Sequence, residues 1–198
     1  MAQLYFRYST MNSGKTANLL MVAHNYEEQN KKVLIFKPTL DTRSSKSKIE
    51  SRIGLSHDCI DINKEFELLK YVARNNYNKL SCVLVGEAQF LTKDQVLDLT
   101  YIVDILKIPV ICYGLKNSFV NGELFTGTKF LLFYSDKLEE LKNVCVWCNK
   151  KATMNLHIVD GIPTYSGDMI HCGDTKASED YYIPTCREHY FHPNLDEL

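Results

Sequence analysis

The stretch "QLYFRYSTMNSGKTANLLM" (residues 3–21) decides the fold, because it places a small polar loop between a strand pattern and a helix pattern. "QLYFRY" (3–8) is rich in aromatic residues and predicts a strand, and "KTANLLMVAHNYEEQ" (15–29) repeats apolar residues at helical spacing. The loop between them ends in the Gly-Lys-Thr of the phosphate-loop (P-loop) pattern G-x4-G-K-[ST], with a serine where the first glycine stands. Backbone N–H groups and a lysine would bind phosphate there, and a hydroxyl would bind Mg2+. The predicted loop consists of Ser9, Thr10, Met11, Asn12, Ser13, Gly14, Lys15 and Thr16.

Strand and helix patterns continue to alternate through the first 142 residues. The succession of strands and helices predicts an α/β fold: a P-loop (RecA-like) parallel sheet with helices on both faces. Within the strands the apolar residues are continuous and do not alternate with polar ones, which agrees with a sheet buried on both faces. A Thr-x-x-Gln capping box at Thr92 marks the start of one helix. The expected strands are 31–38, 81–85 and 108–115, and the expected helices are 65–77 and 92 to about 107.

In residues 143–198 the helical periodicity fades, and we predict a second, small unit held by a metal ion. Cys145-x2-Cys148 and Cys186-x2-His189 offer three thiolates and an imidazole, the ligand set of a tetrahedral Zn2+ site. Because all four ligands come from the protein, we expect the zinc to be structural. The other histidines lack such pairing and are expected in surface or loop positions: His24, His57, His157, His171 and His192.

Composition narrows the possible partners. The chain has 198 residues and a formal net charge of −1, so it carries no long-range electrostatic attraction for nucleic acid or an anionic membrane. No leader pattern opens the chain and no apolar run approaches the roughly 18 residues of a membrane span. We therefore expect a cytoplasmic protein that binds neither nucleic acid nor membrane.

The segment "CVLVGEAQFL" (82–91) places a carboxylate, Glu87, where a buried strand ends. Ligands of open parallel sheets bind beyond the carboxyl ends of the strands, so Glu87 is expected at the same edge as the phosphate loop. The alternative is that Glu87 only ends the strand and faces solvent. Its position favours a functional role.

Six ordered segments resemble the zinc-containing thymidine kinases of bacteria, bacteriophages, large DNA viruses and animal cytosol, over nearly the whole chain. They are "YSTMNSGKT", "FKPTLDTR", "VGEAQFL", "YGLKNSFVNGELFTG", "SDKLEELKNVCVWC" and "CREHY". The resemblance implies transfer of the γ-phosphate of ATP to the 5′-hydroxyl of thymidine or deoxyuridine, with Mg2+ accompanying ATP, in a homotetramer.

The resemblance also implies roles for individual residues. Glu87 would accept the proton of the 5′-hydroxyl. Asp41 and Arg43 would lie near the phosphates, as would Gly86, Ala88 and Gln89. A loop at about 163–185, tied by the zinc, would bind the base through its backbone. The positions implied to line the nucleoside pocket are Met11, Phe90, Leu115, Phe119, Phe125 and Tyr182.

Two departures from the family pattern stand out. Gly86 replaces the aspartate that precedes the glutamate in the family, so we expect weaker Mg2+ binding and a weakened kinase. The run "IHCGDTKASEDYY" (170–182) has Cys172 in place of a glycine and extra polar residues. Two alternatives to an active kinase are a nucleotide-binding but catalytically impaired relative, and a generic P-loop ATPase acting on a macromolecule.

Overall fold

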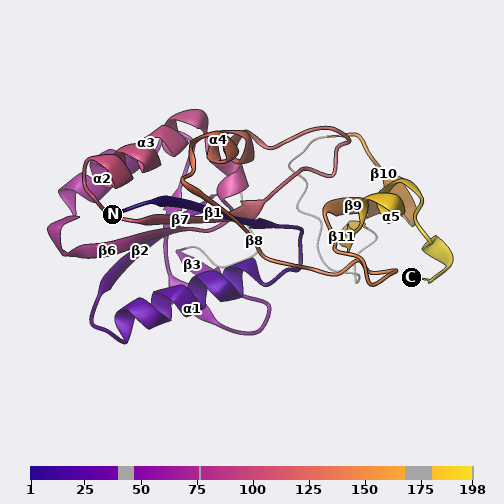
Figure 1. Cartoon of the computed structure of the whole chain (residues 1–198), viewed down its shortest axis with the longest axis horizontal. Coiled ribbons are helices and arrows are strands. Elements are labelled where there is room, and N and C mark those ends of the chain that lie inside the picture. The colour runs from indigo at the N-terminus through magenta and orange to yellow at the C-terminus, as the bar shows by residue number, and fades with distance from the viewer. Residues whose placement is uncertain (40–46, 76, 168–179, 198) are drawn as a thin grey trace.

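The computed structural model describes residues 1–39, 47–75, 77–167 and 180–197, and its centre is a six-stranded sheet. The strand order is β5-β2-β6-β7-β1-β8, and every pairing in it is parallel (Figure 1). The predicted parallel sheet is therefore confirmed. Its strands are β1 (Leu4–Ser9), β2 (Lys32–Pro38), β5 (Ile60–Ile62), β6 (Leu80–Val85), β7 (Val110–Leu115) and β8 (Lys137–Glu140).

Helices cover both faces of this sheet, as predicted. Helix α1 (Lys15–Glu27) lies on one face, and α2 (Leu68–Arg74), α3 (Lys93–Asp104) and α4 (Thr126–Tyr134) lie on the other (Figure 1). Each face has its own apolar core because the strands are buried on both sides. In the described residues, no helix combines the length and apolar composition that a membrane span requires.

The structure corrects several boundaries. The helix expected at 65–77 is only α2, and the helix expected to reach about residue 107 ends at Asp104. The capping box at Thr92 is confirmed, since its side chain accepts from the Gln95 backbone at 3.2 Å and the Gln95 side chain accepts from the Thr92 backbone at 3.1 Å. Elements that the sequence analysis did not predict include α4, β5, β8, the hairpin of β3 (Lys48–Glu50) and β4 (Ser56–Asp58), and the short helices Tyr77–Lys79, Ala88–Phe90 and Leu195–Glu197.

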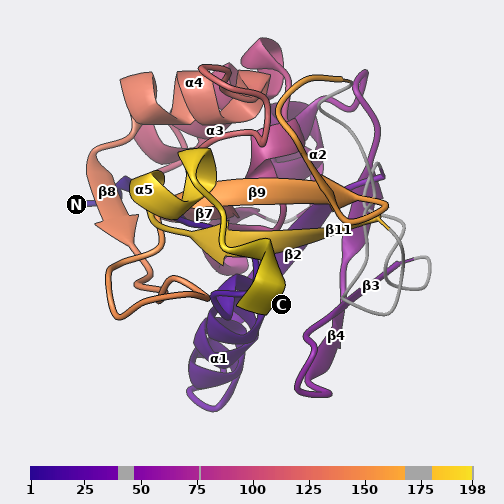
Figure 2. The same ribbon diagram turned by 90° about the vertical axis from the view of Figure 1, so that its right-hand side faces the viewer.

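The C-terminal part forms a separate small sheet beyond the carboxyl ends of the main strands (Figure 1). Its order is β10-β9-β11, with β9 (Met154–Val159), β10 (Ile162–Thr164), β11 (Asp180–Thr185) and then α5 (Arg187–Phe191). Within the part of it that the structure describes, the buried apolar cluster consists of Leu156, Ile158, Ile183 and Tyr190. Figure 2 shows this small sheet in front of the ends of the main strands.

The expectation that the unpaired histidines lie at the surface is wrong for His157. This residue lies in the middle of β9 and is 2% exposed. Its Nε2 contacts the Asp180 carboxylate at 2.5 Å, and its ring stacks on Tyr182 at 4.3 Å between centroids. The sequence around His157 gave no sign of its burial, because its partners Asp180 and Tyr182 come from a strand more than twenty residues later.

The first turn of α4 packs against the backbone just after β6. A Cβ at Gly127 would lie 2.2 Å from the carbonyl oxygen of Ala88, a backbone atom that cannot simply rotate away. We expect Gly127→Ala to lower the free energy of unfolding by about 1–3 kcal/mol, the usual cost of overpacking. Chemical denaturation measures this, with Thr126→Ala on the exposed side of the same turn as the control; equal stability of the two variants would contradict the prediction.

Candidate active site and metal centre

The phosphate loop leads from β1 into α1 through two residues in left-handed backbone conformation. Asn12 has φ 59°, and Gly14, which caps α1, has φ 75° and ψ 18°. A Cβ at Gly14 would meet nothing within 4 Å, so a glycine is favoured there for its positive φ and not for close packing. The first turn of α1 has neither a side-chain cap nor an acidic residue, so its N–H groups point out of the helix start. Such a helix start attracts anions.

Ser9 takes the place of the first glycine without strain. It ends β1, lies outside the positive-φ residues, and is 4% exposed. Its hydroxyl donates a short hydrogen bond to the Leu141 carbonyl just after β8. A serine is therefore accommodated in this loop because the backbone is extended there and its hydroxyl has an acceptor.

The Lys15 side chain folds over its own loop. Its Nζ donates to the Thr10 carbonyl at 2.6 Å and approaches the Ser13 hydroxyl at 3.3 Å. The ammonium group is thus held by two other residues of the phosphate loop.

Glu87 follows β6 directly and is held by its neighbours. Its backbone is left-handed, with φ 47°, and its carboxylate accepts a 2.6 Å hydrogen bond from the Gln89 amide nitrogen. The Gln89 amide oxygen in turn accepts from the Leu115 N–H at 3.1 Å, at the end of β7. Since Gln89 is 1% exposed, its amide links the end of β7 to the Glu87 carboxylate inside the protein. Ala88 is buried as well, at 0% exposed.

Strand order sets the separation between Glu87 and the phosphate loop. Strand β7 lies between β1 and β6, so the ends of β1 and β6 are two strand spacings, or about 10 Å, apart. Both strands run parallel to β7, and their carboxyl ends therefore reach the same edge of the sheet.

The space beside Gly86 is filled by a side chain from the β3–β4 hairpin. A Cβ at Gly86 would lie 2.7 Å from the Cδ1 atom of Ile49 and 3.6 Å from that of Leu19. Ile49 is 3% exposed and belongs to the core on the α1 face. An apolar group therefore occupies the surroundings of the position where the family pattern has an aspartate.

Aromatic side chains gather in two groups beyond the sheet edge. Phe90 and Phe125 meet edge to face at 5.6 Å between centroids. Phe119 meets His157 at 4.6 Å and Tyr182 at 5.7 Å. Four of these rings belong to expected pocket residues, and they form two pairs: Phe90 with Phe125, and Phe119 with Tyr182. Leu115, another expected pocket residue, lies at the end of β7, where its N–H donates to Gln89.

Two asparagines of the C-terminal part hold the phosphate loop. The Asn155 side chain accepts from the Met11 N–H at 2.7 Å and donates to the Asn117 carbonyl at 3.1 Å. The Asn143 amide nitrogen donates to the Met11 carbonyl at 3.0 Å and to the Thr10 hydroxyl at 3.1 Å. Both backbone groups of Met11 are therefore bonded by the part of the chain that carries the metal ligands.

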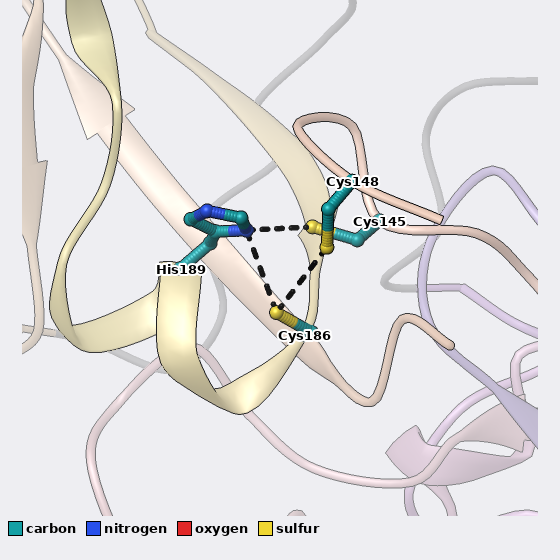
Figure 3. Close-up of side chains that lie close together, drawn as sticks. All are labelled: Cys145, Cys148, Cys186 and His189. Carbon is teal, nitrogen blue, oxygen red and sulfur yellow. Dashed lines mark hydrogen bonds between the residues drawn. The ribbon is translucent and has the colours of Figure 1, made fainter. Parts of the chain in front are cut away.

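The four predicted metal ligands converge (Figure 3). Their donor atoms all lie within 4.8 Å of one another. Cys148 Sγ lies 3.9 Å from Cys186 Sγ, and Cys145 Sγ lies 3.3 Å from His189 Nδ1. Zn–S bonds of about 2.3 Å in a tetrahedron place two sulfurs about 3.8 Å apart. The donor set and its spacing therefore fit a structural zinc ion.

The surroundings of Cys145 favour the thiolate that zinc requires. Burial opposes its ionisation, but backbone N–H groups at Cys186 and Trp147, with the His189 ring, outweigh burial and lower the pKa of Cys145 to about 6. By contrast, burial raises the pKa of Cys82 to about 12, so this thiol stays protonated and packs as an apolar side chain.

Some expected site residues lie outside the described residues. These are Asp41, Arg43 and the middle of the expected base-binding loop at 168–179, including His171 and Cys172. Sequence reasoning also missed residues that the structure brings to the site: Asn143, Asn155 and Ile49. Short-range patterns could not find them, since their partners are distant in the chain.

Comparison with known proteins adds the family. The model of the family described as thymidine kinase matches residues 2–190. The thymidine kinase of Enterococcus faecalis is 54% identical over 193 residues, which cover 98% of this chain and 96% of that protein. Those of Lactiplantibacillus plantarum and Streptococcus pyogenes are 50% and 48% identical, each over 98% of this chain, and over 97% and 100% of the relatives.

Among solved structures, the Pif1 helicase of Candida albicans is 12% identical, with a TM-score of 0.43 over 72% of this chain and 36% of that chain. The family match over residues 2–190, by contrast, spans the phosphate loop, the Glu87 segment and all four cysteine and histidine ligands. This chain belongs to the thymidine kinase family.

Proposed function

We propose that the chain transfers the γ-phosphate of ATP to the 5′-hydroxyl of thymidine or deoxyuridine at the sheet edge between residues 9–16 and Glu87. The observation that carries this proposal is the shared edge: β1 and β6 end on the same side of the sheet, with one strand between them. The gap of about 10 Å leaves room for a phosphoryl group and the hydroxyl that attacks it. A panel of nucleosides with ATP and Mg2+ tests the proposal directly.

The donor phosphates would bind to the loop and the start of α1. First-turn N–H groups and the Lys15 ammonium supply the positive field, and Lys15 would exchange its present contact with the Thr10 carbonyl for phosphate oxygens. Met11 is not counted among the phosphate donors, since its N–H is bonded to Asn155. Bound Mg2+ would neutralise phosphate charge, with the Thr16 hydroxyl as its protein ligand.

Glu87 would accept the proton of the 5′-hydroxyl as the phosphoryl group transfers. Gln89 would be a positioning residue, because its amide bridges Glu87 and the end of β7. Phe90, Phe119, Phe125, Leu115 and Tyr182 would surround the nucleoside, since flat aromatic rings suit a flat, uncharged base.

The family also suggests an oligomeric state, a cellular location and a division into domains. We propose a homotetramer in the cytoplasm, with a P-loop domain at 1–142 and a zinc-binding domain at 143–198. Light scattering coupled to size-exclusion chromatography gives the mass of the assembly against the 22.8 kDa chain. A monomer under assay conditions would contradict the tetramer.

The loss of the strand-end carboxylate predicts weaker binding of Mg2+. Restoring it by Gly86→Asp alone would force the new side chain against Ile49, so the test pairs Gly86→Asp with Ile49→Ala. We expect the double variant to bind Mg2+ about tenfold to hundredfold more tightly than Ile49→Ala alone, the scale of an outer-shell metal contact. Rates at several Mg2+ concentrations measure this, and identical Mg2+ dependence in the two variants would exclude the idea.

A further inference from the structure

The β3–β4 hairpin ends in a tight turn that fixes Arg52 at its tip. The Gly54 N–H donates to the Ser51 carbonyl at 3.0 Å, and the Ser51 N–H donates to the Leu55 carbonyl at 2.8 Å. The Ser51 hydroxyl also accepts from the Leu55 N–H at 3.1 Å, and Gly54 takes the positive φ of 84° that the turn needs. Arg52 therefore projects from a turn closed on both sides.

Three contacts hold the hairpin on the α1 side of the sheet (Figures 1 and 2). Ile49 packs beside Gly86, and the Nζ of Lys37, 2% exposed, donates to the Lys48 carbonyl at 2.8 Å. On the return strand, His57 Nε2 contacts the Glu27 carboxylate at the end of α1 at 2.9 Å. A methyl group at position 86 would clash only with the Cδ1 end of the Ile49 side chain, which can rotate, and the Lys37 and His57 contacts would still hold the hairpin.

Arg52 reaches the phosphate loop from this docked position. Its guanidinium donates a short hydrogen bond to the side-chain oxygen of Asn12, in the middle of residues 9–16. Asn12 takes one of the five donors of the guanidinium, and among the described residues Arg52 has no ion-pair partner. A fixed positive charge with spare donors beside a phosphate loop suits phosphate oxygens, which arginine binds through two parallel N–H groups.

We propose that Arg52 binds the outer phosphates of ATP, and that the docked β3–β4 hairpin holds it beside the phosphate loop. Arg52 then contributes one positive charge beside the phosphate loop. This charge favours the negatively charged phosphates. This proposal rests on the proposed function, in that residues 9–16 bind ATP.

The first test is Arg52→Gln, which keeps a donor for Asn12 but removes the charge. We expect the KM for ATP to rise about tenfold to hundredfold, with the KM for thymidine within twofold of wild type, since charge-assisted phosphate contacts are strong. Arg52→Lys should recover part of the loss, because it restores charge without the planar fork. Arg74→Gln, an exposed arginine on α2 on the other face, is the matched control and should change nothing.

The second test asks whether the hairpin delivers Arg52. Ile49→Ala removes the side chain that packs the hairpin into the core on the α1 face and should also raise the KM for ATP. Combining it with Arg52→Gln should cost less than the product of the two single effects, because a loosened hairpin no longer presents Arg52. Full independence of the two effects would overturn the delivery, and an unchanged KM for ATP in Arg52→Gln would overturn the binding role.

Direct binding of MgATP separates this proposal from the proposed function. A wild-type chain that binds MgATP but phosphorylates no nucleoside defeats the proposed kinase reaction, while weaker MgATP binding in Arg52→Gln still supports the role of Arg52. If wild type, Arg52→Gln and Arg74→Gln bind MgATP equally, the proposed role of Arg52 in phosphate binding is wrong, whatever the nucleoside assays give.

Discussion

Glu87→Gln is expected to lower kcat for thymidine phosphorylation by about 10²- to 10⁴-fold, the usual contribution of a general base. The amide has the size of the carboxylate and can still contact Gln89, so the backbone after β6 should keep its place. What is lost is the capacity to take the proton of the 5′-hydroxyl. Steady-state rates with saturating ATP and thymidine measure the effect.

The affinity for MgATP is the control measurement for Glu87→Gln. The affinity for MgATP should stay within about twofold of wild type, because phosphate binding is assigned to residues on the other side of β7. Glu65→Gln, an exposed glutamate before α2, should retain the full rate. A Glu87→Gln enzyme with a near-normal kcat would remove Glu87 from the role of base.

The second large effect concerns the metal centre. His189→Ala removes one of the four converging donor atoms, and we expect loss of bound zinc, a lower melting temperature and loss of nucleoside phosphorylation. The reason is the small core of this part of the chain: among its described residues, the cluster has four buried apolar side chains. A core of this size does not stabilise a sheet without a crosslink, and structural zinc in small peptides contributes about 10–16 kcal/mol.

Matched variants separate zinc loss from a general effect of mutation. His192→Ala alters an exposed histidine three residues further on and should keep the zinc, the melting temperature and the activity. Metal analysis of the purified wild-type chain should give one zinc per chain. A wild-type protein without zinc, or a His189→Ala variant with unchanged stability, would show that the cluster is not a metal site.

The sequence predicted those features whose signal is local. Residues 9–16 stand between a strand and a helix, the capping box at Thr92 uses residues three apart, and each metal-ligand pair spans four residues. Each of these patterns is complete within one turn or one short segment, so no knowledge of the tertiary structure was needed.

The features that were missed depend on contacts between distant segments. Strands β3, β4 and β5 have three residues each, too short for a period to be recognised. His157 is buried only because Asp180 and Tyr182 pack on it from β11. Likewise, nothing near Gly86 in the sequence indicates that Ile49, from a hairpin 37 positions earlier, fills the adjacent space.

The hydrogen bonds of Asn143 and Asn155 to the Met11 backbone have a consequence for folding during synthesis. The nucleotide-binding loop is synthesised first, yet the two amides that fix its backbone come from the last third of the chain. A nascent polypeptide that has emerged only as far as residue 142 lacks both of them. The phosphate loop, although made early, therefore gains these two backbone contacts only after most of the chain has been synthesised.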